Sequence, residues 1–387
     1  MIKLVESKLS YEGVLDFVDN IFGASMHAKR VGSLADAAFG LLQSEEMLLH
    51  KMGAGLALGK SLNKKHATKQ IDRLLSNPKF DVWEQSEQWL QYMIGDREEL
   101  IFSMDWTDFD DDDQSTIAIN LLSSHGRASP VLWKTVNKSS LKNNRARYED
   151  QILSQLRKII PEEVDVTILA DRGFADQKFF EFIEKTLMFS YIIRIRSNTY
   201  IYDEKGEGRY AKDWLKENGH TQCLKNVDVT LTRYQAPRFV CTKQEKMKDA
   251  WFIVSNRDDL NGTQIVKLYG KRWTIETYFR DLKDQRYGWG FQETHIGNPE
   301  RRDRALFISS ICTVLLTLLG AAGENIGFDK KLKVNTVKTR THSLLTQGIF
   351  YLKAFGNFSI QEKSQLMLEF DRLLILQTLW KNLFFVV

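Results

Sequence analysis

Two different periods of hydrophobic and polar positions divide this chain into regions. Residues 1–98 repeat apolar side chains every three to four positions, as between Leu34 and Leu49, which is typical of amphipathic helices. From residue 99 the texture changes to short apolar runs joined by polar links, which predict strands at 100–106, 115–124 and 130–136. We therefore expect a helical N-terminal domain of residues 1–98, followed by a domain that begins with a three-strand meander.

Alternating helix and strand patterns continue after the meander. The expected elements are a helix at 147–160, a strand at 164–170, a helix at 176–185 and a strand at 190–196. A meander that leads into an α/β sheet is the plan of the ribonuclease-H-like, or retroviral-integrase-like, fold. Short alternating segments within 198–257 predict a β-rich insertion, with strands at 228–234, 238–241 and 250–254. We expect this catalytic domain to span 99–328 and a helical C-terminal region to span 329–387.

A polar run between Tyr269 and Lys283 carries the densest functional signal. On one continuous helix, at about 100° per residue, Tyr269, Arg272, Glu276 and Lys283 would share an arc about 60° wide, with Arg280 at its border. One acid among cations and a tyrosine, beside an apolar face, suits a metal-dependent site that handles a nucleic-acid backbone. An amphipathic helix with a solvated charged face is the alternative.

Composition limits the kind of protein this can be. The net charge of the 387 residues is only +4, so affinity for nucleic acid would come from local patches. Three widely spaced cysteines without a CxxC pair indicate free thiols in a reducing cytoplasm. The start of the chain shows no secretory signal pattern. The uncharged run Ala305–Gly323 approaches the length of a membrane span, but its serines and threonines favour a buried core helix, so we expect no membrane association.

A short basic element lies in the N-terminal region. The segment from Ser61 to Leu75 resembles a turn followed by a recognition helix, anchored by apolar positions near its end. The cations that we expect to contact DNA phosphates are Lys64, Lys65, Lys69 and Arg73, with His66 beside them. A basic surface helix without a DNA partner would show the same pattern.

Three acids on separate predicted elements could form one pocket. Asp105 ends the first strand of the meander and Asp171 ends the fourth strand, two strands that lie side by side in a ribonuclease-H-like sheet. Glu276, on the later helix, would supply a third carboxylate. Three carboxylates can hold two Mg²⁺ ions about 4 Å apart, which suits in-line attack at phosphorus. Taken singly, strand-end aspartates often only begin turns.

Several motifs around these acids resemble one family. They are AspTrpThrAspPhe around Asp105, AlaAspArgGlyPhe around Asp171, the Tyr-x2-Arg-x3-Glu-x6-Lys spacing from Tyr269, and TyrGlyTrpGly from Tyr287. This set resembles the DDE transposases of bacterial cut-and-paste insertion sequences, and most of all the subgroup with the enzyme of the tetracycline-resistance composite transposon. The likeness covers about 99–345.

The resemblance implies a site and a reaction. Asp105, Asp171 and Glu276 would bind two Mg²⁺ ions, for which Mn²⁺ could substitute, while Tyr269, Arg272 and Lys283 would contact DNA phosphates. The enzyme would bind terminal inverted repeats as a dimer, cut them through a hairpin intermediate and join them to target DNA, at the nucleoid. In this family the β-rich insertion supplies an aromatic residue for a flipped base; Trp214 and Trp251 lie there, although a core role suits each better.

Two alternatives remain open. One is a structure-specific DNA endonuclease on the same fold, which cuts without strand transfer. The other is a DNA-binding protein that keeps a transposase scaffold but uses no catalysis.

Overall fold

The computed structural model describes residues 9–123, 127–245, 247–286 and 288–375. Residues 376–387, the end of the expected C-terminal region, therefore lie outside the described residues. The N-terminal part is helical, as predicted. Its helices are α1 (Tyr11–Phe22), α2 (Ala28–Ser44), α3 (Leu49–Lys60), α4 (Lys64–Leu75) and α5 (Ser86–Ile94).

One mixed sheet organises the middle of the chain. Its strands are β1 (Glu99–Phe109), β2 (Gln114–Leu121), β3 (Ser129–Asn137), β4 (Asp165–Ala170), β5 (Ser190–Arg194), β6 (Tyr200–Tyr202), β7 (Gly208–Tyr210), β8 (Gln222–Val229), β9 (Tyr234–Thr242) and β10 (Trp251–Ser255). Their order across the sheet is β3-β2-β1-β4-β5-β10-β9-β8-β6-β7. The strands β1, β4 and β5 are parallel, whereas β2 and β3 form the antiparallel meander.

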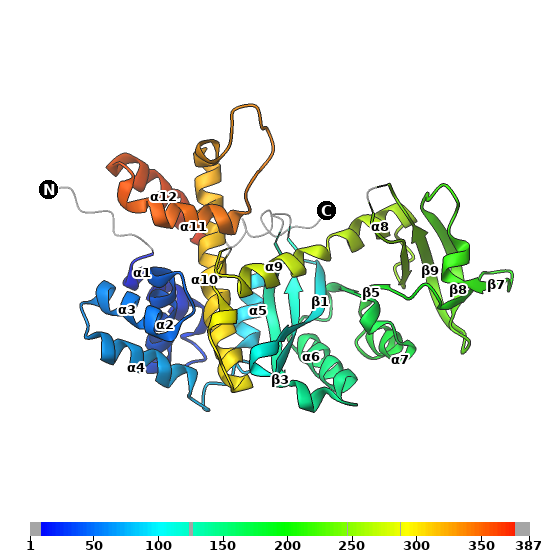
Figure 1. The fold of residues 1–387 in the computed structure, drawn as a ribbon, viewed down its shortest axis with the longest axis horizontal. Helices are drawn as coiled ribbons and strands as arrows, with labels where there is room; N and C mark the ends of the chain where they lie inside the picture. Colours follow the sequence, from blue (N-terminus) through cyan, green and yellow to red (C-terminus); the bar gives the residue numbers. More distant parts are fainter. Residues whose placement is uncertain (1–8, 124–126, 246, 287, 376–387) are drawn as a thin grey trace.

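Helices follow the strands in the predicted order. They are α6 (Arg145–Ile159), α7 (Gln177–Glu181), which continues as a π-helical turn over Phe182–Thr186, α8 (Gly262–Gly270) and α9 (Trp273–Lys283). In Figure 1, α9 crosses the end of the sheet near β1, while α6 and α7 lie near its opposite side. The seven elements expected between residues 100 and 196 are confirmed within a few residues at their ends.

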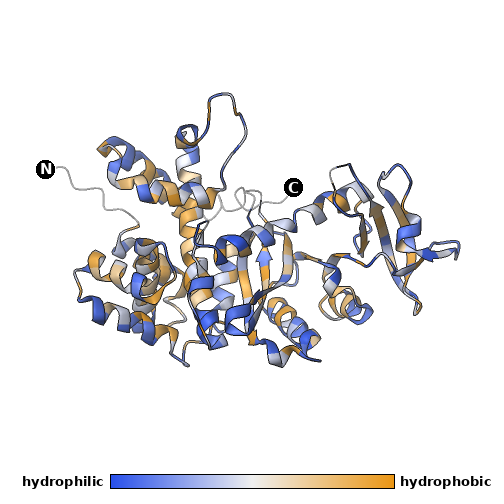
Figure 2. Cartoon of the chain, in the orientation of Figure 1, coloured by the Kyte–Doolittle hydropathy of each residue, from blue (hydrophilic) through white to orange (hydrophobic). Residues whose placement is uncertain are grey.

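The helix α10 (Pro299–Asn325) lies in the middle of the molecule and contacts elements of several regions. It packs against α2, β3, α11 (Leu344–Ala354) and α12 (Ile360–Ile375). Figure 2 shows its apolar residues along the middle of the fold. Among the described residues it is the one helix long and apolar enough to cross a membrane, yet its apolar stretch is wholly buried inside the protein. This agrees with the predicted core helix.

Three sequence predictions were wrong in detail. The strand expected to end at Asp105 continues as β1 to Phe109, so Asp105 lies within the strand. The expected continuous helix through Tyr269 and Lys283 is broken at residues 271–272, where hydrogen bonds to the third residue back, such as from Arg272 N to Tyr269 O at 3.0 Å, replace the α-helical ladder. The predicted strand 228–234 spans a hairpin turn instead, because Thr230 and Arg233 adopt positive φ between β8 and β9.

Candidate active site

Asp105 and Asp171 lie next to each other where two parallel strands meet. The register of β1 and β4 pairs Met104 with Ala170, and an aspartate follows each of them: Asp171 directly after the end of β4, and Asp105 within the neighbouring β1. The backbone N–H of Trp106 donates to Asp105 Oδ1 at 2.9 Å. Asp171 accepts from Gly173 N at 2.7 Å and so begins a short helical turn. The two carboxylates therefore converge without sharing a hydrogen bond.

Glu276 reaches the same place from α9, which packs on β1. One guanidinium connects it to the first aspartate: Arg272 Nη1 donates to Asp105 Oδ2 at 3.1 Å, and Arg272 Nη2 donates to Glu276 Oε1 at 2.6 Å. The Arg272 side chain is only 12% exposed and that of Asp105 19%, so little solvent screens this pair. Arg272 is thus shared between two of the three acids.

Burial and like charges together weaken the acidity of Asp105. Burial raises its pKa, the charges of Asp171 and Glu276 raise it further, and Arg272 and the Trp106 N–H oppose them, which leaves the pKa at about 6. The pKa of Arg272 is itself raised: burial opposes its charge, but Tyr269, Asp105 and Glu276 outweigh that effect. The charges of Asp171 and Glu276 therefore act on Asp105, and Arg272 offsets them and the burial only in part.

The donor atoms of these three acids suit a hard divalent cation, because carboxylate oxygens are the ligands that Mg²⁺ and Mn²⁺ prefer. In the conformation observed, no group of three His, Cys, Asp or Glu side chains within the described ranges is arranged to hold a metal. In this conformation Arg272 donates to oxygens of Asp105 and Glu276, and the Gly173 N–H donates to one oxygen of Asp171.

The other residues predicted from the polar run are placed less uniformly. Tyr269 is buried on α8, with its ring centroid 5.8 Å from the Arg272 guanidinium and 5.0 Å from the Trp251 ring. Lys283 donates to the backbone oxygen of Asp108 and lies over the Phe109 ring.

Arg280 points to a different acid. It pairs with the buried Asp281 at 3.1 Å, and Arg127 pairs with the same carboxylate at 2.6 Å. The structure therefore brings Arg272 to Asp105 and Glu276, leaves Tyr269 beside Arg272, and pairs Arg280 with a different acid.

Two tryptophans bear on the prediction that an aromatic residue contacts a flipped base. Trp214 lies in the β-rich insertion, and Trp273 lies at the start of α9. Trp214 is buried and donates from Nε1 to Ile201 O at 3.4 Å, which is a core contact. Trp273, which the sequence analysis did not single out, directly follows Arg272 and is 63% exposed. Its position off the apolar stripe of the helix was a usable signal, since a tryptophan there has no core to enter.

The helix α4, which carries the basic element, lies apart from β1 and α9, which carry Asp105 and Glu276 (Figure 1). Ser61, in the left-handed conformation with φ 52°, and the N-cap residue Asn63 connect α3 to α4 through a tight turn. The two helices approach closely at Gly53, where a Cβ would lie 2.1 Å from Thr68 Oγ1. The exposed side chains of α4 include all four predicted DNA contacts, Lys64, Lys65, Lys69 and Arg73.

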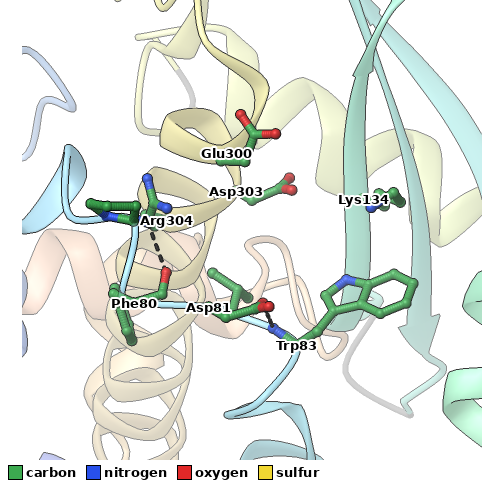
Figure 3. Close-up of a pocket in the computed structure, with 9 residues that line it drawn as sticks. Phe80, Asp81, Trp83, Lys134, Glu300, Asp303 and Arg304 are labelled. Atoms are coloured by element: carbon green, nitrogen blue, oxygen red, sulfur yellow. Dashed lines mark hydrogen bonds between the residues drawn. The ribbon is translucent and has the colours of Figure 1, made fainter. Parts of the chain in front are cut away.

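A cavity of about 220 Å³ lies where β3, α10 and the segment before α5 meet (Figure 3). Arg304 crosses it to donate to Phe80 O at 2.8 Å, and Asp303 Oδ1 accepts from Thr135 N at 2.9 Å. Burial raises the pKa of Asp303 to about 7. These contacts hold the N-terminal helices to the rest of the fold, so the cavity is a structural joint that is separate from the carboxylate cluster.

Comparison with known families gives an independent result. Residues 125–315 match the family described as the transposase DDE domain. That match supports a DDE transposase family. It spans just under half of the chain and includes Asp171 and Glu276, while Asp105 lies before it. No curated protein matches the chain. A transposase domain is one that acts on DNA, and its members generally use divalent metal ions.

The three cysteines are free thiols, as predicted.

Proposed function

We propose that this protein is a DNA transposase that binds the inverted repeats of a transposable element, cuts them in a metal-dependent reaction and joins them to target DNA. One observation carries the proposal: two aspartates from neighbouring parallel strands meet a glutamate from α9, and a single arginine links the first aspartate to that glutamate. The strand order β3-β2-β1-β4-β5, with an antiparallel meander leading into parallel strands, supports a ribonuclease-H-like core.

Asp105, Asp171 and Glu276 would hold the metal, Mg²⁺ or Mn²⁺, and we propose two ions per site. When bound, such ions lower the pKa of water or a 3′-hydroxyl and stabilise charge on the departing oxygen. The chain's own contribution would be to gather three carboxylates from two neighbouring inner strands and one helix. Burial of Asp105 also keeps solvent from weakening its electrostatic interactions.

Arg272 would bind a backbone phosphate of the transposon end. Its planar guanidinium forms paired hydrogen bonds with phosphate as readily as with carboxylate. A phosphate close to the site would therefore draw Arg272 from Asp105 and Glu276 and leave their oxygens for the metal. Lys283 and the half-exposed Arg280 would add positive charge along the same helix. Tyr269 is buried, so its role would be to position the Arg272 guanidinium, which lies beside its ring.

The N-terminal helices 1–98 would bind the inverted repeats through α4, and residues 99–328 would form the catalytic domain. Two transposon ends must be brought together, so we propose a homodimer in the complex with DNA. The β-rich insertion and the exposed Trp273 would contact a hairpin intermediate with an unstacked base. The protein would act at the nucleoid of a bacterial cytoplasm, with the C-terminal region 329–387 outside the catalytic core.

The direct test uses a plasmid in which the DNA flanking the coding region brackets a marker. With Mg²⁺, the protein should excise the marker and join it to a second plasmid. Asp105→Ala should abolish cleavage yet retain end binding in a gel shift. Supplying pre-nicked ends separates a transposase from an endonuclease, because only the transposase joins them. Equal cleavage by Asp105→Ala would rule out the metal-ligand assignment, and binding without any cleavage by the native protein would favour a non-catalytic scaffold.

A further inference from the structure

A hollow of about 350 Å³ lies between the beginning of α2 and the second half of α4. It is formed by two helices that pack together beside the basic face of α4. Its lining residues are His27, Lys29, Arg30, Ser33, Gln70, Arg73, Leu74 and Asn77.

The charge of this hollow is entirely positive. Lys29, Arg30 and Arg73 contribute permanent cations, and no carboxylate is among its lining residues. The nearby acids are engaged elsewhere, since Asp36 pairs with Lys60 and Asp72 pairs with Arg301, both at 2.8 Å. The first turn of α2 also carries no acid. Cations at that end of a helix are unfavourable beside the helix dipole, so they indicate an anion from outside the protein.

The hollow continues a row of cations on α4. Lys65, Lys69 and Arg73 are spaced four residues apart, so they share one face over about 12 Å. One DNA strand carries a phosphate about every 3.4 Å of helix axis, and 12 Å therefore spans roughly three phosphates. Arg73 is the last cation of this row, and it also lines the hollow. Lys29 and Arg30 thus extend the row onto a second helix.

The neutral lining suits the same ligand. The side chains of Ser33, Gln70 and Asn77 donate hydrogen bonds to phosphate oxygens without reading base identity. We propose that this hollow binds a backbone phosphate of duplex DNA through Lys29, Arg30 and Arg73, so that α2 fixes the register of α4 on the duplex. This inference rests on the proposed function and adds α2 to the DNA-binding surface.

The test measures binding of the full-length protein to a fluorescent 30-base-pair duplex of mixed sequence by anisotropy, over a series of salt concentrations. Lys29→Gln with Arg30→Gln should reduce the slope of log affinity against log salt by about 1, since both cations bind the same phosphate and each phosphate contact contributes roughly 1. Affinity near 0.1 M salt should fall at least about tenfold. The matched control is Lys330→Gln with Lys338→Gln, two exposed lysines of the C-terminal region, which should leave the slope unchanged.

A third variant separates this inference from the proposed function. Lys65→Gln with Lys69→Gln removes the row on α4 and leaves the α2 cations in place. If that variant loses slope while the α2 variant binds like the native protein, the hollow is not a phosphate site, although α4 still binds DNA. If neither variant changes the slope, DNA binding by these helices fails altogether. Thermal melting of each variant, expected to match the native protein, shows that a loss of binding is not a loss of folding.

Discussion

Replacing Asp105 by asparagine should make the metal-free protein more stable while abolishing its activity. The pKa of Asp105 rises from its ordinary 3.8 to about 6, chiefly through burial. A tenfold change in an acid's dissociation constant corresponds to about 1.4 kcal/mol, so ionised Asp105 costs the folded protein about 3 kcal/mol at neutral pH. Asparagine has nearly the same shape and carries no charge, and Arg272 keeps its bond to Glu276. We expect a gain on the order of 2 kcal/mol.

The pH dependence of the free energy of unfolding gives the direction of this effect. Because the folded pKa lies above the unfolded one, the stability linked to Asp105 is present below about pH 4 and is lost as the pH rises through about 6. Urea unfolding in the presence of a chelator should therefore show Asp105→Asn more stable than the native protein at pH 7. The two proteins should have similar stability at pH 4. Adding Mg²⁺ at pH 7 should stabilise the native protein and leave the variant almost unchanged.

Asp303 provides a matched control. It is another buried aspartate whose pKa is raised, to about 7, but it lies in the joint between β3 and α10. Asp303→Asn should likewise gain stability above pH 7, yet respond to Mg²⁺ and cut DNA as the native protein does. The reasoning is refuted if Asp105→Asn is less stable than the native protein at pH 7 without metal, or if Mg²⁺ stabilises it equally.

Further predictions concern Arg272, the packing of α10 and the salt response. Arg272→Gln frees oxygens of Asp105 and Glu276, so calorimetry should show tighter Mn²⁺ binding by the DNA-free variant; weaker or equal binding contradicts a shared site. Gly320→Ala puts a Cβ 1.9 Å from the Leu344 backbone oxygen, so urea unfolding should show a loss of about 1–3 kcal/mol, and an unchanged midpoint would contradict the packing of α10 on α11. DNA affinity of the native protein should fall steeply with salt; a flat response would mean that the α4 cations form only a solvated surface.

Much of the site could be predicted because its aspartates obey local rules. An acid that directly follows buried strand residues has few stable environments, and the parallel register of β1 and β4 sets Asp105 beside Asp171. The order of strands and helices between residues 100 and 196 follows from hydrophobic periodicity in the same way.

The remaining features depend on contacts between distant segments. The break at 271–272 is set by how α8 and α9 pack on different parts of the sheet, and helical periodicity does not encode it. The sharing of Arg272 between two acids likewise requires α9 to cross β1 at one particular place. The hollow between α2 and α4 brings Lys29 and Arg30 beside Arg73, more than 40 positions later in the chain, so neither helix alone indicates it.

The most direct measurement of the central claim is anomalous scattering from crystals grown with Mn²⁺ and a duplex taken from the DNA that flanks the coding region. The account predicts anomalous peaks within about 2.2 Å of carboxylate oxygens of Asp105, Asp171 and Glu276, with Arg272 turned from the acids to a phosphate. Peaks that exclude any one of these carboxylates, or an Arg272 still bonded to Asp105 and Glu276 beside bound DNA, would contradict it.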